Sequence, residues 1–212
     1  MLLLGVFKTL LYRYTGQEDI CVGTAIANRN HAQTENLIGF FVNMLPLRLI
    51  LRGNLSFREL LQQVREITID AYAHQDLPFV MLVEDLHAER SSSRAPLFQV
   101  VFVMQNATVA ALELPDLTLR PLPVNIGRVQ FDLMLSIFEA ERGLVVSLEY
   151  NTSLFKPSKI DSMLTHFKGL LEAIASNIDL RLIDINLENH EDASSHLPLL
   201  VENVYANERF MF

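Results

Sequence analysis

An apolar stretch at residues 37–51 limits the fold more than any other part of the sequence. It is apolar enough to be a buried strand, and leucine recurs at every second position, at Leu45, Leu47, Leu49 and Leu51. Gly39 lies near its start and Asn43 lies inside it, followed by Pro46, which cannot donate a hydrogen bond to a neighbouring strand. Two interpretations of Asn43 stay open: its amide is satisfied by nearby backbone in a core strand, or the strand turns this polar side chain toward a cleft.

The 212-residue chain has the length of one domain, and half of its residues are hydrophobic, which allows a large core. Its net charge of -8 and its scattered basic residues argue against nucleic acid as a partner. No apolar run reaches the roughly 18 residues that span a bilayer, so no membrane association is expected. Cys21 is the only cysteine and lies in an apolar run, which predicts a buried, unreactive thiol and fits a reducing cytoplasm.

The first half of the chain alternates between helical and strand patterns. Apolar residues at helical spacing predict a first helix that ends at a turn, with Gly16 in the left-handed conformation. No capping residue precedes this helix, so the chain is expected to begin inside an element, as a fragment would. A strand over residues 20–27 and a helical turn over residues 35–38 precede the strand described above.

Two further helices are predicted after that strand. Ser56 and Glu59 have the spacing of a capping box, which starts a helix that ends near His74. Pro78 is expected in the first turn of the next helix, where its missing N–H costs nothing. The buried face of this helix is predicted to consist of Phe79, Leu82, Val83 and Leu86.

The second half predicts an exposed loop at residues 90–96, a strand over 97–105, a further strand near 117–119 and a proline-flanked loop over 121–127. A hairpin of two strands, 131–137 and 144–150, and a last helix from Pro157 to about Asn177 follow. The predicted fold class is α/β, a two-layer sandwich with helices packed on a mixed β-sheet. Residues 1–178 form this domain, and residues 179–212 form a weakly patterned tail.

The residues alone do not complete an active site. The six histidines lack the spacing of metal ligands, and the sequence has no glycine-rich phosphate loop and no Gly-x-Ser-x-Gly elbow. His74 and Asp76 form a close pair at a helix corner, where a C-terminal charge partner and an N-cap are the simpler interpretation. No metal site and no directly bound cofactor are predicted.

Five segments in order resemble successive motifs of the condensation domains of nonribosomal peptide synthetases: residues 12–19, 23–29, 38–43, 74–79 and 90–99. The resemblance runs from about residue 3 to about residue 178. It implies a lobe similar to chloramphenicol acetyltransferase, one of two lobes with a tunnel between them. Carrier domains present an acyl or peptidyl thioester and an acceptor amine on phosphopantetheine arms, and amide formation follows in the tunnel. The family's His-His-x-x-x-Asp-Gly motif belongs to the first lobe and is absent from this sequence, so the chain resembles the C-terminal lobe without the catalytic histidine.

The resemblance also implies which residues line the substrate tunnel: Asn43, Gly39, Asp76, Pro78 and Asp132. Asn43 would hold substrate amide or carbonyl groups, and Asp76 and Pro78 would shape the neighbouring corner. Arg94 would hold a backbone carbonyl or the phosphopantetheine phosphate, with an ordinary salt bridge as the alternative. No catalytic residue is assigned.

Two functional hypotheses follow. The chain is half of an amide-forming acyltransferase that is inactive without an N-terminal lobe, or it is a noncatalytic remnant or interaction module of the same fold. An epimerisation domain fits less well, because the Phe-Val-Asn motif and the Leu-x-Leu-Arg pattern after it resemble condensing members. The face that would meet the first lobe is expected to be partly apolar, so the isolated chain should bind that lobe or self-associate.

Overall fold

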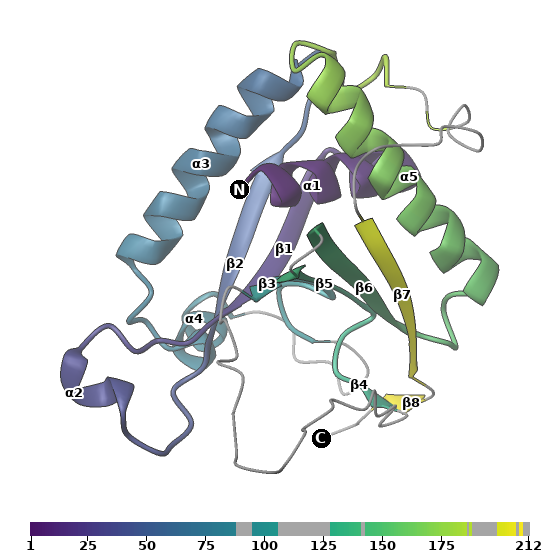
Figure 1. Ribbon diagram of the computed structural model, residues 1–212. Coiled ribbons are helices and arrows are strands. Elements are labelled where there is room, and N and C mark those ends of the chain that lie inside the picture. Colours follow the sequence, from purple (N-terminus) through teal and green to yellow (C-terminus); the bar gives the residue numbers. More distant parts are fainter. Residues whose placement is uncertain are drawn as a thin grey trace.

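The computed structural model describes residues 1–87, 95–105, 128–140, 143–185, 187, 199–206 and 208–209 (Figure 1). A sheet in the order β2-β1-β3-β5-β6-β7 is covered by helices, and α1 lies across it between α3 and α5 (Figure 1). The helices are α1 (Leu2–Thr15), α2 (Ala32–Glu35), α3 (Phe57–Ala73), α4 (Phe79–Asp85) and α5 (Pro157–Ser176). The strands are β1 (Asp19–Ile26), β2 (Asn43–Ile50), β3 (Val100–Gln105), β4 (Arg128–Val129), β5 (Leu133–Ala140), β6 (Gly143–Asn151), β7 (Leu199–Ala206) and β8 (Glu208–Arg209).

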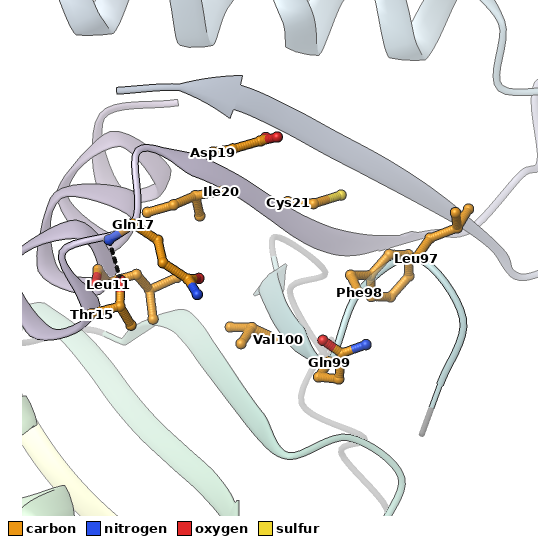
Figure 2. Close-up of a pocket in the computed structure, with 10 residues that line it drawn as sticks. All are labelled: Leu11, Thr15, Gln17, Asp19, Ile20, Cys21, Leu97, Phe98, Gln99 and Val100. Atoms are coloured by element: carbon orange, nitrogen blue, oxygen red, sulfur yellow. Dashed lines mark hydrogen bonds between the residues drawn. The ribbon is translucent and has the colours of Figure 1, made fainter. Parts of the chain in front are cut away.

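The main sheet is mixed, as predicted. β1 runs antiparallel to β2, with Gly23 opposite Pro46, and parallel to β3, with Gly23 opposite Val101. β3 is parallel to β5, β5 and β6 form the predicted antiparallel hairpin, and β7 is parallel to β6. Toward the start of β1, a pocket opens between this strand and the segment that leads into β3 (Figure 2).

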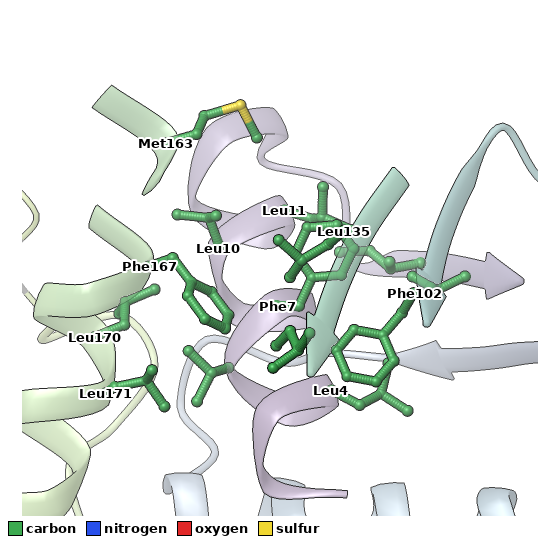
Figure 3. Close-up of a cluster of buried hydrophobic side chains, with 14 of the residues drawn as sticks. Leu4, Phe7, Leu10, Leu11, Phe102, Leu135, Met163, Phe167, Leu170 and Leu171 are labelled. Atoms are coloured by element: carbon green, nitrogen blue, oxygen red, sulfur yellow. The ribbon is translucent and has the colours of Figure 1, made fainter. Parts of the chain in front are cut away.

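The hydrophobic core lies between one face of the sheet and the three long helices. Alternate residues of β1, β2, β5 and β6 join residues of α1, α3 and α5 in one buried cluster. Figure 3 shows the centre of this cluster, where α1 meets the sheet and α5 through Leu4, Phe7, Leu10, Leu11, Phe102, Leu135, Met163, Phe167, Leu170 and Leu171. The two-layer α/β sandwich predicted from the sequence is therefore confirmed.

Local signals in the sequence located several element ends correctly. The capping box is present: Ser56 Oγ accepts a hydrogen bond from the Glu59 backbone N–H, and a Glu59 carboxylate oxygen accepts one from the Ser56 N–H at 2.8 Å. Gly16 ends α1 with a φ of 69°. α5 begins at Pro157, as expected for proline in a first helical turn.

Other predictions need correction. The strand begins at Asn43, and residues 37–42 belong neither to a helix nor to a strand, because the chain leaves the sheet there and exposes its apolar side chains. The helical turn is Ala32–Glu35 and not 35–38. Pro78 is the N-cap of α4 with extended backbone, and of the four side chains predicted to form the buried face of this helix only Val83 is fully buried.

The last part of the chain contributes a strand that its pattern did not predict. β7 lies within the predicted tail, residues 179–212, and its backbone pairs with β6 over eight residues. Its register in the sheet comes from a partner distant in sequence, which a local pattern cannot reveal. The strand predicted near residues 117–119, the loop at 121–127 and most of the loop at 90–96 lie outside the described residues.

Candidate functional site

The Asn43 side chain joins the start of β2 to the corner between α3 and α4. Its Nδ2 donates to the carbonyl oxygens of Gln75 at 3.0 Å and Leu77 at 2.8 Å. Its Oδ1 accepts a hydrogen bond from the backbone N–H of Phe79 at 3.0 Å. The residue is 9% exposed. The amide is thus satisfied by neighbouring backbone, and its predicted contact with substrate stays a prediction.

Two other predicted tunnel residues lie at the same corner. Asp76 is exposed between α3 and α4, and its Oδ1 accepts a hydrogen bond from Asn30 Nδ2 at 3.3 Å. Pro78 caps α4 and is also exposed. The structure therefore brings Asn43, Asp76 and Pro78 together, although the chain separates the first from the others by more than thirty residues.

Gly39 lies in the segment between α2 and β2. A Cβ atom placed on it would lie 3.0 Å from the Cε2 atom of Phe41, so a larger residue would crowd that ring. The Phe41 ring in turn lies under the Arg29 guanidinium, 4.2 Å from its carbon atom to the ring centroid. Gly39 therefore has a local packing role, and its place in a tunnel stays a prediction.

A row of aromatic rings connects the Asn43 corner to the start of β5. The rings of Phe79 and Phe98 lie 5.3 Å apart between centroids, and those of Phe98 and Phe131 lie 5.9 Å apart. Asp132, which follows Phe131, donates its backbone N–H to Gln99 O at 3.0 Å and accepts at its carbonyl from the Asn151 N–H at 3.0 Å. The aromatic row thus ends beside the fifth predicted tunnel residue.

Sequence reasoning missed the residue that makes room for this row. A Cβ atom on Gly23 would lie 2.1 Å from Phe98 Cε2, so the ring packs directly on the glycine backbone in the middle of β1. An isolated glycine inside a strand pattern is a known sign of such a close approach, and the sequence carried that sign. Arg94, the sixth predicted site residue, lies outside the described part of the chain.

The pocket in Figure 2 has a volume of about 230 Å³ and shares Phe98 with the aromatic row. Its lining includes Thr15, Gln17, Asp19, Cys21 and Gln99, and contains none of the predicted tunnel residues. Asp19 pairs with Arg48 at 2.6 Å, and this hydrogen bond lowers the pKa of the aspartate carboxyl. Cys21 is partly exposed, and not buried as the sequence predicted. Its partial burial still raises the pKa of the thiol, which keeps it protonated and a poor nucleophile at neutral pH.

Lys8 of α1 is fully buried, which the sequence pattern did not indicate. Its Nζ donates to the carbonyl oxygens of Ile20 on β1 at 3.0 Å and Leu47 on β2 at 2.7 Å. Loss of hydration lowers the pKa of the ammonium group to about 8. This lysine ties the central helix to two strands of the sheet.

Within the described residues, no group of three or more histidine, cysteine, aspartate or glutamate side chains is arranged to hold a metal ion. None of the described helices is long and apolar enough to cross a membrane. The residues that the structure does bring together are a corner held by hydrogen bonds and an aromatic row, which can shape a surface for a substrate.

Comparison with known proteins identifies the family. The family model for the condensation domain matches residues 1–195. A linear gramicidin synthase protein of Brevibacillus parabrevis is 47% identical over 194 residues, which cover 91% of this chain and 4% of that protein. Surfactin synthase subunit 1 of Bacillus subtilis is 42% identical over 197 residues, which cover 93% of this chain and 6% of that protein. The chain therefore spans only a small part of these relatives.

Solved structures agree on the fold. A four-domain nonribosomal peptide synthetase, holo-AB3403, matches with a TM-score of 0.79 at 23% identity, over 88% of this chain and 15% of that one. The X-domain from teicoplanin biosynthesis matches with a TM-score of 0.76 at 27% identity, over 87% of this chain and 43% of that one. The predicted chloramphenicol-acetyltransferase-like lobe is confirmed. The chain belongs to the condensation-domain family of the nonribosomal peptide synthetases.

Proposed function

We propose that this chain is the C-terminal lobe of a condensation domain, which forms amide bonds between acyl or aminoacyl thioesters in nonribosomal peptide synthesis. The observation that carries the proposal is the Asn43 corner, where two segments that resemble family motifs are joined by three hydrogen bonds. The match to 43% of the length of the X-domain chain supports a lobe of a larger domain. The thioesters are held on phosphopantetheine arms of carrier domains, and the chain itself binds no cofactor.

The lobe supplies one wall of the tunnel and no catalytic group. The wall consists of Asn43, Gly39, Asp76, Pro78 and Asp132. Asn43 fixes the corner through its amide, and the exposed Asp76 and Pro78 present its surface to substrate. Arg94 would hold a backbone carbonyl or the phosphopantetheine phosphate. The amine is positioned or deprotonated by the histidine motif of an N-terminal lobe, because that step needs a group within hydrogen-bond reach.

The proposed partner of this chain is the N-terminal lobe of a condensation domain, which would bind an exposed apolar surface beside the Asn43 corner. Leu37, Ile38, Phe40 and Val42 are exposed beside the corner, as are Val80 and Met81 on α4. Exposed apolar surfaces of this kind usually bind a partner. The isolated chain is therefore expected to self-associate when that lobe is missing. The complex of the two lobes works with carrier domains in the cytoplasm.

The test is reconstitution of amide formation. The chain is mixed with an N-terminal lobe from a related synthetase and with loaded donor and acceptor carriers, and the product is measured by mass spectrometry. Product that needs both lobes supports the proposal. Asp76→Ala and Asn43→Ala should reduce the product rate, whereas Asn54→Ala, an exposed asparagine away from the corner, should not.

The second hypothesis, a noncatalytic interaction module of the same fold, predicts a different result. Binding to the N-terminal lobe without product, for every lobe and carrier pair supplied, would support it and would refute the amide-forming role. Circular dichroism of each variant separates loss of product from loss of folding. Asp76→Ala is informative even if Asn43→Ala unfolds, because the Asp76 side chain is exposed.

A further inference from the structure

The segment between β1 and β2, residues 28–42, combines an ordered backbone with exposed apolar side chains. It extends with α2 beyond the ends of β1 and β2 (Figure 1). Ile38 is fully exposed and Phe40 is 91% exposed, while Leu37 and Val42 are about half exposed. Exposure of these apolar side chains to water is unfavourable, so other interactions must stabilise this conformation of the segment. The structure shows what holds it.

Arg29 organises this segment through its guanidinium group. Nη1 donates to Thr34 O and to Leu37 O, the second at 2.8 Å, and also lies 3.4 Å from Glu35 O. Nη2 donates to Gly39 O over a longer distance of 3.4 Å. The plane of the group also lies over the Phe41 ring. The Arg29 side chain therefore contacts the backbone from Thr34 in α2 to Gly39, a few residues before β2.

Both ends of the segment are fixed as well. Asn28 has a φ of 51°, a left-handed conformation that asparagine tolerates and that turns the chain directly before Arg29. Asn30 donates to Asp76 at 3.3 Å, and Asn43 is bonded to the same corner. With its ends tied to the α3–α4 corner, the segment depends on Arg29 for the conformation of its middle.

Lysine cannot replace arginine in this role. A guanidinium presents five N–H donors in a rigid plane that can serve several carbonyls and stack on a ring at once, whereas an ammonium is a compact point charge. An ordered segment that presents apolar side chains binds a partner without the entropy cost of ordering them on contact. The cost of holding Phe40 and Ile38 in water is offset only when a partner covers them.

We infer that Arg29 is a positioning residue that holds residues 28–42 in the conformation that docks on the N-terminal lobe of the condensation domain. This inference rests on the proposed function for the identity of the partner. The partner is the other lobe because the matched chains of single condensation and X-domains are more than twice as long as the part this chain covers. The docked surface is the apolar edge of the segment, and Arg29 acts on it only through the backbone carbonyls it binds.

The test measures local order and binding separately. Hydrogen exchange of residues 31–42 is followed by mass spectrometry in the free chain, and the dissociation constant for an N-terminal lobe is measured by calorimetry. Arg29→Lys should speed exchange and weaken binding, each by about tenfold, with an unchanged urea midpoint. Arg52→Lys, at an exposed arginine just beyond the other end of β2, should change neither. Phe40→Ala should weaken binding without changing exchange.

The outcomes separate the two proposals. If the wild-type chain binds the lobe and Arg29→Lys binds equally well, the positioning role is refuted while the proposed function stands. Unchanged exchange in Arg29→Lys refutes it too. If the wild-type chain binds no N-terminal lobe, the proposed function fails and the docking role fails with it, whatever the exchange data show.

Discussion

The buried lysine of α1 should make the stability of this domain depend on pH in the alkaline range. Lys8 is 0% exposed, and its ammonium group donates to Ile20 O and Leu47 O. Burial lowers its pKa from 10.5 to about 8, with a smaller opposing effect from the charges of Cys21 and Asp19. Between these two pH values the unfolded chain holds a proton that the folded chain has released.

The sign and size of the effect follow from this difference. Because the unfolded state binds more protons, the free energy of unfolding rises with pH in this window. A shift from 10.5 to about 8 gives a gain of about 2.5 kcal/mol between pH 7 and pH 10. The stabilisation is lost again as the pH falls and the buried amine becomes charged. Lys8→Met has no titrating group at this place and should lack the gain.

Urea unfolding followed by circular dichroism at pH 7, 8, 9 and 10 tests this. Wild type and Lys8→Met are compared in a Cys21→Ala background, so that the nearby thiol does not titrate. The stabilities of the two proteins should diverge by about 2.5 kcal/mol from pH 7 to pH 10 in favour of the lysine form. A constant difference between wild type and Lys8→Met would refute the reasoning.

Three further predictions concern packing and hydrogen bonds. Asn43→Ala should lower the free energy of unfolding by about 1–3 kcal/mol, measured in urea, because it leaves three partly buried backbone groups of the corner without their partner. Ser56→Ala removes half of the capping box of α3 and should cost about 1 kcal/mol in thermal unfolding, while Ser56→Asp should keep most of the stability. Gly23→Ala should destabilise by about 1–3 kcal/mol through the clash with the Phe98 ring. In the double variant with Phe98→Ala the added cost of the alanine should vanish, and additive costs would contradict this explanation.

Patterns of neighbouring residues predicted most of the elements. The spacing of leucine in β2, the capping box at Ser56 and the alternation in the hairpin each depend on residues close in the chain, and the structure confirms all three. The prediction was wrong at residues 37–42, because an apolar run has the same composition whether it enters the sheet or leaves it with its side chains exposed. Only the presence or absence of a neighbouring strand shows whether such a run lies in the sheet or outside it.

The arrangement of the predicted site residues could be read from the sequence only in part, for the same reason. The motifs named Asn43, Asp76 and Pro78, but the hydrogen bonds of the Asn43 amide come from a corner far along the chain, and no local pattern could supply them. Arg29 and Gly23 were missed as individual residues. Their roles depend on backbone carbonyls of residues 34–39 and on the Phe98 ring from the segment that leads into β3, which become neighbours only in the folded chain.

The sequence by itself determined the family, the two-layer α/β class and several helix ends, because motifs and capping residues act over a few positions. Only the tertiary structure decided the surroundings of each element. The first helix reads as amphipathic, yet α3, α5 and the sheet enclose it, so that even Lys8 is buried. The sequence of a helix specifies its backbone hydrogen bonds but not the elements that pack against it. Those elements determine which side chains are desolvated and which pKa values shift.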